Sequence, residues 1–232
     1  MTGAANEGKE LTRAIDGTTY ARIPIRTHVV TPGEDIEQIV EKYAASQLQS
    51  GDLLFVTEKI VAITQGRSYL VEDIHPRPLA RFLSRYVVKT AYGIGLGMPE
   101  TMEMALREGG TPRILFAAAV SAVTKMFGRR GDFYRIAGDR ARAIDGPTDG
   151  TIPPYDRAVV LGPTEPDAVA ARLKELLGTP AAVAVVDIND IGGNILGSTL
   201  DKAGEQQLVR ILSDNPLGQG RQSTPMGIIR PA

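Results

Sequence analysis

The chain of 232 residues contains no cysteine and only two histidines, His28 and His75. Without cysteine it has no disulfide bond, no thiolate nucleophile and no cysteine-ligated zinc or iron–sulfur site. A metal site built on histidine would need both imidazoles. The chemistry of a functional site is therefore expected to rest on other polar side chains.

Long apolar runs and an excess of charge of one sign are also missing. No apolar stretch approaches the roughly 20 residues needed to span a bilayer, and residues 1–16 lack the apolar centre of a signal peptide. Lys and Arg number 26 against 27 Asp and Glu, a balance that gives no reason to expect a nucleic acid or an anionic membrane as partner. A soluble, cytoplasmic protein is the default expectation.

Hydrophobic periodicity and turn residues predict a mixture of helices and strands. The expected strands are residues 20–30, 133–137, 156–161, 183–186 and 226–230, with two β-rich runs on either side of residues 57–59. One helix is expected to start with a capping box at residues 31–34. Others are expected at residues 79–87, 99–108, 164–177 and about 202–213. Residues 113–125 suit either a buried strand or a short buried helix.

The order of these elements mixes βα units with adjacent strands, which favours an α+β fold with a mixed sheet over a doubly wound one. Residues 1–18 are expected to form a loose lead-in. Residues 19–232 are expected to form a single domain, because no Pro/Ser-rich linker marks a boundary within them.

A polar, glycine-bearing segment follows the apolar run at residues 183–186. The run is typical of a strand buried on both faces, and it ends in Asp187, Asn189 and Asp190, with Gly192 and Gly193 behind them. Carboxylate and amide oxygens at the end of a strand suit a hard cation such as Mg²⁺, Mn²⁺ or Ca²⁺. The alternative is an Asx-rich turn, since Asn and Asp bond their own backbone.

Two further loops combine glycine with polar side chains. Residues 143–151 contain Asp145, and residues 218–224 read GQGRQST. In the second loop, glycine would let backbone N–H groups approach an anion, and Arg221 adds positive charge, as in phosphate-binding loops. Each loop alone is equally compatible with an ordinary turn, and neither matches a Walker motif.

The segments GDLLFVTEKIVAITQGR, AIDGPT, VAVVDINDIGG and PLGQGRQSTPMGIIR, together with IPIRTHVVTPGEDI near the N-terminus, occur in a characteristic order. In this order and spacing the chain resembles the coenzyme F420-0:L-glutamate ligase (γ-glutamyl ligase) family. The resemblance extends from about Ile23 to Arg230 and is loose between residues 79 and 134. It implies an α+β fold of the F420-0 γ-glutamyl ligase type, with mixed, largely antiparallel sheets and packed helices.

The resemblance also implies an activity and a site. Members of the family join L-glutamate to a carboxylate with GTP and two divalent metal ions, Mg²⁺ or Mn²⁺, and form homodimers. Carried over by position, the metal ligands would be Asp145, Asp187, the backbone of Ile188 and, as a weak ligand, Gln219. The nucleotide contacts would be Glu58, Lys59, Thr148, Gly218, Gly220, Arg221, Gln222, Ser223 and Thr224. Asn189 and Asp190 remain secondary candidates, and no catalytic residue is assigned.

Three departures from the family pattern bear on the substrate. A nucleotide-contacting lysine of the family falls on Ile63, a metal-binding glutamate falls on Gln219, and the arginine-rich segment after Asp187 is absent. The first hypothesis is a metal- and nucleotide-dependent γ-glutamyl-type ligase that activates a carboxylate as an acyl phosphate, with GTP or ATP and an unidentified acceptor. The alternative is a non-catalytic nucleotide- or metabolite-binding regulatory protein on the same scaffold. A third reading is an interaction module whose loops are only turns.

Overall fold

The fold is taken from a computed structural model, which describes residues 4–87, 95–129, 131–148, 150–178, 180–189, 192–218, 220 and 222–232. The chain divides into two compact units. Unit 1 comprises residues 1–66 and 163–232, and unit 2 comprises residues 67–162. A single domain is predicted from residue 19 onward, because no linker of distinctive composition marks a boundary. The chain passes between the two units after Gly66 and before Pro163.

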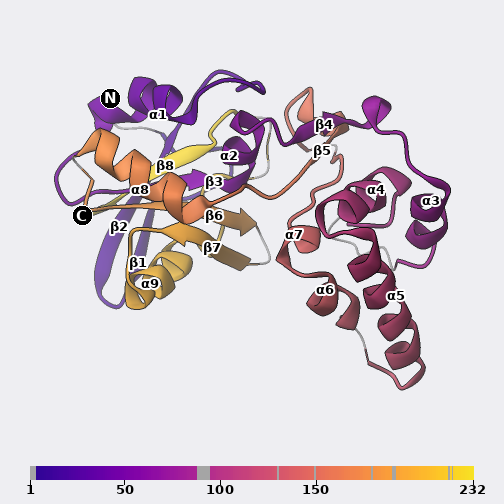
Figure 1. Cartoon of the computed structure of the whole chain (residues 1–232). Coiled ribbons are helices and arrows are strands. Elements are labelled where there is room, and N and C mark those ends of the chain that lie inside the picture. Colours follow the sequence, from indigo (N-terminus) through magenta and orange to yellow (C-terminus); the bar gives the residue numbers. More distant parts are fainter. Residues whose placement is uncertain are drawn as a thin grey trace. The chain divides into compact units, whose positions relative to one another are not determined.

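Unit 1 is built on a six-stranded sheet with the strand order β1-β2-β8-β3-β6-β7 (Figure 1). The strands are β1 (Thr12–Ile15), β2 (Thr18–Ile25), β3 (Leu53–Thr57), β6 (Ala182–Asn189), β7 (Gly192–Ser198) and β8 (Met226–Pro231). Neighbouring strands are antiparallel, except that β3 and β6 run parallel. This mixed, largely antiparallel sheet confirms the expected α+β class.

Helices cover both faces of this sheet. They are α1 (Ile36–Ala44), α2 (Glu58–Thr64), α8 (Pro166–Leu177) and α9 (Lys202–Leu212), with a 3₁₀ turn at Ala45–Gln47. Figure 1 shows α1 and α8 on one side of the sheet and α9 on the other. Leu208 and Leu212 of α9 pack with Phe55, Ala184 and Val186. Since successive strand residues face opposite sides, β6 is buried on both faces from residue 182 to 186, as its apolar sequence predicts.

A close backbone approach joins β7 to the start of α8. A Cβ atom added at Gly197 would lie 2.2 Å from the backbone nitrogen of Asp167. The Asp167 carboxylate in turn accepts a hydrogen bond from the Ser198 N–H at 3.0 Å. Glycine is therefore required at residue 197, because any side chain there would overlap the backbone of α8.

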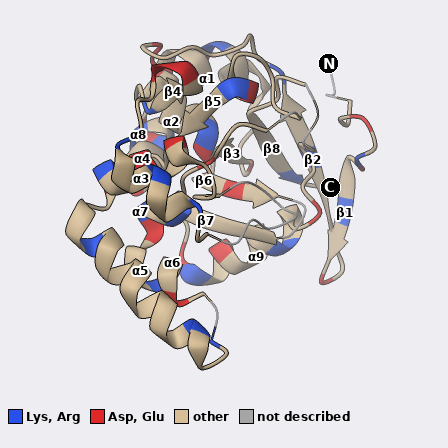
Figure 2. Ribbon diagram, turned by 90° about the vertical axis from the view of Figure 1, so that its right-hand side faces the viewer, with Lys and Arg blue, Asp and Glu red and all other residues tan. Residues whose placement is uncertain are grey.

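Unit 2 is largely helical. It contains a two-stranded sheet, β4 (Ser68–Leu70) and β5 (Ala158–Val160), and 3₁₀ turns at Val71–Asp73 and Tyr155–Arg157. Its helices are α3 (Pro78–Ser84), α4 (Pro99–Glu108), α5 (Thr111–Met126), α6 (Asp132–Ala137) and α7 (Asp139–Arg142). The α5 sequence holds Arg113 and Lys125 but no acidic residue, which is visible as blue without red in Figure 2.

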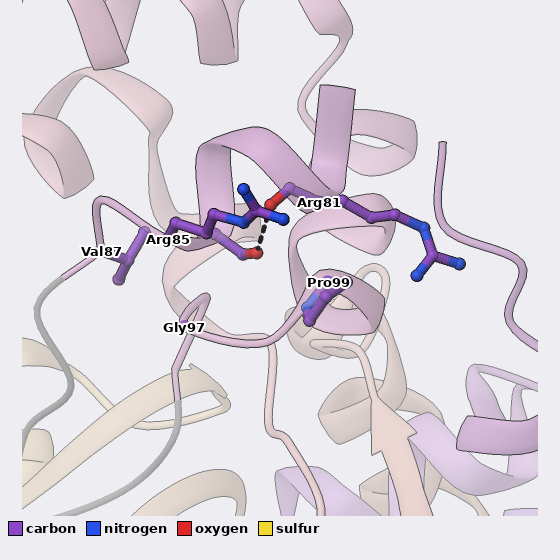
Figure 3. A pocket seen from close by; sticks show the side chains of 6 residues that line it. Arg81, Arg85, Val87, Gly97 and Pro99 are labelled. Atoms are coloured by element: carbon purple, nitrogen blue, oxygen red, sulfur yellow. Dashed lines mark hydrogen bonds between the residues drawn. The ribbon is translucent and has the colours of Figure 1, made fainter. Parts of the chain in front are cut away.

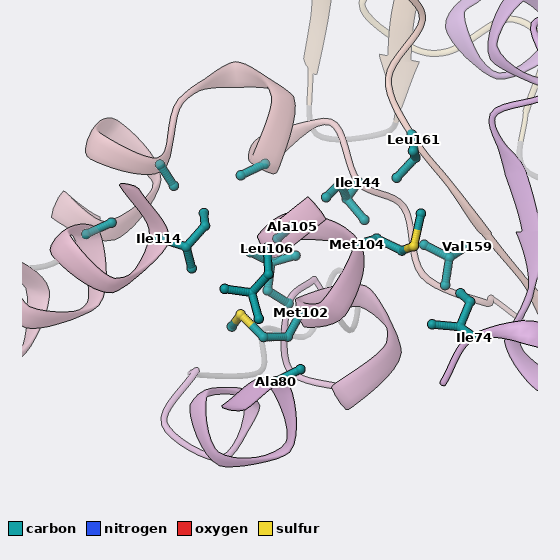
Figure 4. Packing of buried hydrophobic residues seen from close by; sticks show 14 residues of the cluster. Ile74, Ala80, Met102, Met104, Ala105, Leu106, Ile114, Ile144, Val159 and Leu161 are labelled. Atoms are coloured by element: carbon teal, nitrogen blue, oxygen red, sulfur yellow. The ribbon is translucent and has the colours of Figure 1, made fainter. Parts of the chain in front are cut away.

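The core of unit 2 is formed mainly by α4 and its neighbours. Met102 and Leu106 of α4 pack in one cluster with Ile114 of α5 (Figure 4). The same helix buries the carboxylate of Glu103, whose side chain is 2% exposed and lies 3.0 Å from both Arg77 and Arg107. Burial acts to raise the pKa of Glu103, but the hydrogen bonds from the two arginines outweigh it and hold that pKa below its ordinary value.

Most elements with strong periodicity lie where the sequence predicts them. The helices expected at 79–87, 99–108, 164–177 and 202–213 correspond to α3, α4, α8 and α9, and residues 113–125 belong to a helix, α5. Two predicted strands are wrong. Residues 133–137 form α6, and the second β-rich run after residue 59 forms α2, whose residues 60–63 are buried. Short apolar runs do not distinguish a strand from a buried helix.

The predicted contact between Thr31 and Glu34 forms, but it is not a complete capping box, and the predicted helix start there is wrong. Glu34 accepts hydrogen bonds from the backbone N–H and the hydroxyl of Thr31, whereas α1 starts at Ile36 with Asp35 as its N-cap. Gly33 adopts a φ of +93°, which is incompatible with a right-handed helix. The chain therefore makes one turn at residues 31–34 before the helix begins.

Candidate functional site

The topology of unit 1 brings several predicted site residues to the same ends of neighbouring inner strands, hereafter the sheet edge. Because β3 and β6 are parallel, with Thr57 opposite Val186, their carboxyl ends lie at the same edge. β8 runs antiparallel to β3, with Met226 opposite Val56, so the start of β8 and residues 222–225 before it belong to that edge too. Three groups of predicted site residues thus lie at the same ends of three adjacent strands: Glu58 and Lys59 follow β3, Asp187 to Asn189 end β6, and Ser223 and Thr224 precede β8. Two strand spacings, about 10 Å, separate the β8 end from the β6 end.

The loop before β8 is attached to the end of β2. The Thr27 N–H donates to the Ser223 carbonyl at 2.8 Å, and the Ser223 hydroxyl donates to the His28 carbonyl at 3.0 Å. On the other side, the Thr57 N–H donates to the Pro225 carbonyl at 2.9 Å. Residues 223–225 are therefore held between β2 and β3 by backbone hydrogen bonds.

A polar cluster follows Thr27 on the same side of the chain. His28 Nδ1 lies 2.8 Å from the Tyr43 hydroxyl and His28 Nε2 lies 2.6 Å from Glu34 Oε2. The N–H of Thr31, and to a smaller extent His28, hold the pKa of Glu34 below its ordinary value. The sequence analysis treats His28 as an ordinary residue, and its contacts here orient the turn that precedes α1.

The junction of β3 and α2 carries the first pair of predicted nucleotide contacts. Glu58 and Lys59 form the first turn of α2 and are both half-buried. Ile63, one turn further on, is 5% exposed and belongs to the core. Ile63 therefore contributes to the core of unit 1 and carries no charge with which to contact a nucleotide.

Asp187 and Asn189 are among the last three residues of β6, which forms a hairpin with β7. Both are half-buried, and they pair with Asn194 and Gly192 across the hairpin. Ile188 packs its side chain over Gly193 and against the core cluster, which leaves its backbone as the part that could bind a ligand. The predicted turn is therefore a hairpin whose second strand, β7, was not foreseen, because its glycines suggest a loop.

Asp145 and Thr148 belong to unit 2 and are described within that unit. Asp145 pairs with Val160 of β5 in an isolated antiparallel bridge. Its N–H donates to the Val160 carbonyl at 2.8 Å, and its carbonyl accepts from the Val160 N–H at 3.0 Å. Its side chain is exposed. The Thr148 hydroxyl donates to the Gly146 carbonyl at 3.3 Å, within a turn. The bridge fixes the backbone from which the Asp145 carboxylate projects.

Among the predicted site residues, Asp190, Gln219 and Arg221 lie outside the described residues. Of those in the described loop, Gly220 is exposed, Gly218, Gln222 and Ser223 are half-buried, and Thr224 is buried. Within the described parts of the chain, no three His, Asp or Glu residues are grouped so as to hold a metal ion by themselves. Likewise, no helix in these parts has the length and apolar character needed to cross a membrane.

The sequence analysis missed the N-terminal segment as part of this region. Asn6 is buried and donates from Nδ2 to the Leu217 carbonyl and to the Thr224 hydroxyl, both at 2.7 Å. The expected loose lead-in also contains β1, which pairs with β2. The polar composition of residues 1–18 gave no signal for the Asn6 contacts, because the partners of Asn6 are 211 and 218 residues away in the sequence.

A separate hollow lies in unit 2, lined by Arg81, Ser84, Arg85, Val87, Gly97 and Pro99. Figure 3 shows the guanidinium groups of Arg81 and Arg85 well separated from each other. Ser84 is buried and donates to the Arg81 carbonyl. The two cations do not converge on one point, so the hollow is a weaker candidate than the sheet edge of unit 1.

Taken together, the fold and the edge define an α+β protein with acidic, basic and hydroxyl side chains gathered at the ends of three adjacent strands. A sequence profile described as F420-0:gamma-glutamyl ligase matches residues 24–198. This match covers more than half of the chain, and the protein belongs to that family.

One curated relative is a coenzyme F420:L-glutamate ligase from Methanopyrus kandleri. It is 26% identical over 162 residues, which correspond to 68% of this chain and 55% of the relative. The chain thus matches just over half the length of that enzyme.

Proposed function

We propose that the protein is a γ-glutamyl-type amide ligase that uses a nucleoside triphosphate and a divalent metal ion to join L-glutamate to a small-molecule carboxylate. The observation that supports this most directly is the common sheet edge of Lys59, Asp187 and Ser223 to Thr224. Family membership supports the reaction type, and the Methanopyrus kandleri relative suggests a place in coenzyme F420 biosynthesis. A reaction that consumes GTP or ATP fits a cytoplasmic location.

In the proposed reaction the γ-phosphoryl group moves to an oxygen of the acceptor carboxylate, which gives an acyl phosphate and the nucleoside diphosphate. The glutamate nitrogen then attacks the acyl carbon, loses a proton, and displaces inorganic phosphate as the amide forms. Phosphoryl transfer depends mainly on positioning and on neutralising charge. Lys59 supplies a cation, and the Thr224 hydroxyl and the Gln222 N–H supply donors to phosphate oxygens.

The described residues fit one type of metal binding. Mg²⁺ is commonly held by one or two carboxylates together with substrate phosphates and water, without a cage made only of protein. A single half-buried carboxylate at the edge of unit 1, Asp187, fits that mode, and Asn189 offers a second oxygen. When bound, the metal would neutralise phosphate charge. Asp145 remains a predicted metal ligand within unit 2.

Calorimetry with Mg²⁺ or Mn²⁺ and either GTP or ATP tests the nucleotide step. We expect one of the two nucleotides to bind in the presence of metal. Phosphate release that requires both L-glutamate and a carboxylate acceptor then tests the ligase step, with the F420 precursor F420-0 compared against simpler carboxylates. The proposal is sunk if neither nucleotide binds with either metal.

A regulatory protein on the same scaffold is the second candidate. It is favoured by Ile63, which places a buried apolar side chain where the family has a nucleotide-contacting lysine, and by β7, which has no arginine. Such a protein would bind a nucleotide or metabolite without turnover. Glutamate-dependent phosphate release would exclude this candidate, whereas tight nucleotide binding without release would favour it.

We also propose that the protein forms a homodimer through the exposed face of α5. Phe116, Val123 and Met126 are 63%, 56% and 84% exposed, and with Ala119 they follow the 3-4-3 spacing of a helix-packing seam. The flanking Leu115 and Phe127 are exposed as well. These five large side chains expose on the order of 600 Å², close to the about 800 Å² per partner of a standard interface.

The distribution of side-chain size along this seam suits a second copy of the helix. Ala119 and Ala122 lie between Phe116 and Met126 along α5. Two helices that cross antiparallel approach most closely at their crossing point and diverge on either side of it. Small side chains at the crossing and large ones beyond it therefore fill the space between two copies.

Light scattering after size exclusion tests the dimer. The wild-type protein should have about twice the 24.8 kDa of one chain. Val123→Glu, which buries a charge in the seam, should give the monomer mass. Lys125→Glu is the matched control, because it introduces the same side chain on the same helix away from the seam. A monomeric wild-type protein, or a dimeric Val123→Glu variant, would contradict the proposal.

A further inference from the structure

The N-terminal segment contacts the loop that precedes β8 at two residues, Leu217 and Thr224. The two hydrogens of the Asn6 amide are donated to the Leu217 carbonyl and to the Thr224 hydroxyl, each at 2.7 Å. The orientation of this amide is fixed, because the Leu217 carbonyl can only accept a hydrogen bond. Asn6 is 7% exposed, so the two bonds are made out of contact with bulk water.

A buried arginine fixes the segment that carries Asn6. Arg22 on β2 is 2% exposed and donates from Nη2 to the Glu10 carbonyl at 2.7 Å, and it forms an ion pair with Asp214. Its backbone N–H donates to the Leu11 carbonyl. Lys9 donates from Nζ to the Asp214 carbonyl at 3.1 Å. The segment is therefore held against the loop along its length and does not depend on Asn6 alone.

The bond from Asn6 also directs the Thr224 hydroxyl. Because the Thr224 oxygen accepts from Asn6, its own hydrogen must be donated in another direction. The neighbouring Ser223 hydroxyl already donates to the His28 carbonyl. Thr224 is thus the hydroxyl of this pair whose hydrogen is oriented by the N-terminal segment.

We infer that Asn6 is a positioning residue for nucleotide phosphates, which it holds in place through Leu217 and Thr224. The inference rests on the proposed nucleotide-dependent function and adds to it a part of the chain that precedes the family match at residue 24. Residues that are fixed before binding lose less conformational entropy when a phosphate binds to them. Removal of the Asn6 side chain should therefore raise the nucleotide Kd by more than the accompanying loss of thermal stability explains.

The experiment compares Asn6→Ala and Asn6→Asp with the control variant Arg13→Ala. Arg13 forms an ion pair with Asp214 at 2.8 Å, so the control loosens the same N-terminal region without touching Leu217 or Thr224. The probe is Mg·GTP or Mg·ATP, whichever binds the wild-type protein, measured by calorimetry. Thermal unfolding and hydrogen exchange at residues 222–227 are recorded for every variant.

We expect Asn6→Ala to raise the Kd of the nucleotide about tenfold and to accelerate exchange at residues 222–227. Asn6→Asp should raise the Kd further, because a carboxylate cannot donate to the Leu217 carbonyl and places negative charge beside the phosphates. Arg13→Ala should leave the Kd unchanged even where it lowers Tm as much as Asn6→Ala. In an active preparation, the Asn6 variants should raise the nucleotide KM more than they lower kcat.

Two results would overturn the inference. One is a nucleotide Kd in Asn6→Ala equal to that of the wild-type protein. The other is unchanged exchange at residues 222–227, which is read without any ligand. A wild-type protein that binds neither nucleotide refutes the proposed function instead, and the exchange experiment then decides whether Asn6 positions the loop.

Discussion

Replacing Asp187 by asparagine removes one negative charge from the edge of the unit 1 sheet while leaving the shape of the side chain nearly unchanged. The backbone pairing of Asp187 with Asn194 across the hairpin does not depend on the side chain, so the fold should persist. If the carboxylate contacts a metal ion that carries the nucleotide, the substitution weakens that contact. The change in affinity then follows from electrostatics.

The size of the effect depends on how far the carboxylate is screened by water. Two unit charges 4 Å apart attract by about 1 kcal/mol in bulk water and by about 4 kcal/mol at an effective dielectric constant of 20. Asp187 is half-buried at the end of its strand, which places it between these limits. A loss of about 2–3 kcal/mol corresponds to a roughly 30- to 150-fold weaker affinity.

Calorimetric titration of Mg·GTP or Mg·ATP into the wild-type and Asp187→Asn proteins measures this difference. The control is Glu175→Gln on α8, an exposed carboxylate near the opposite end of β6. It removes the same charge from the same unit and should change the affinity less than twofold. Equal nucleotide affinity in the wild-type and Asp187→Asn proteins, with equal Tm values, would refute the assignment of Asp187 as a metal ligand.

Further predictions concern stability. Glu103→Gln should lower the free energy of unfolding at neutral pH by about 2–3 kcal/mol, because the buried carboxylate interacts with two arginines. Since the pKa of Glu103 lies below its ordinary value of 4.5, its contribution is present above about that pH and is lost as the pH falls through the lower pKa of the folded state. Urea unfolding should therefore show the variant and the wild-type protein converging in acid, and a difference that persists there would contradict the argument. Gly197→Ala should destabilise unit 1 by about 3 kcal/mol or more, whereas Gly192→Ala on the same strand, with no atom within 4 Å of the added Cβ, should cost far less in the same assay.

The sequence predicts the elements whose signals are local. Proline at the first turn and glycine after the end mark the bounds of α4, and the apolar run of β6 predicts a strand buried on both faces. Residues 133–137 are misread as a strand, because α6 has only six residues, too few to reveal a helical period. The start of α1 is misplaced for a different reason. The contact between Glu34 and Thr31 is correct, but the conformation of Gly33 is set by the turn and has no signature in the hydrophobic pattern.

The candidate site is predictable only in part. The motifs identify Asp187 and the residues before β8, and the pairing of strands then explains why they share an edge. The role of residues 4–11 is not predictable in this way. This polar segment, with Gly8 within it, resembles a loose terminus in the sequence. Its structure depends on contacts with Arg22 and with the distant Leu217 and Thr224.

The sheet order explains why the N-terminal segment meets the loop that leads into the last strand. β8 is inserted between β2 and β3, so the residues before it must lie between the end of β2 and the start of α2. β1 pairs with β2 on its other side, which brings the residues before β1 within reach of the loop that leads into β8. The contact between Asn6 and Thr224 is therefore a consequence of inserting the last strand into the middle of the sheet.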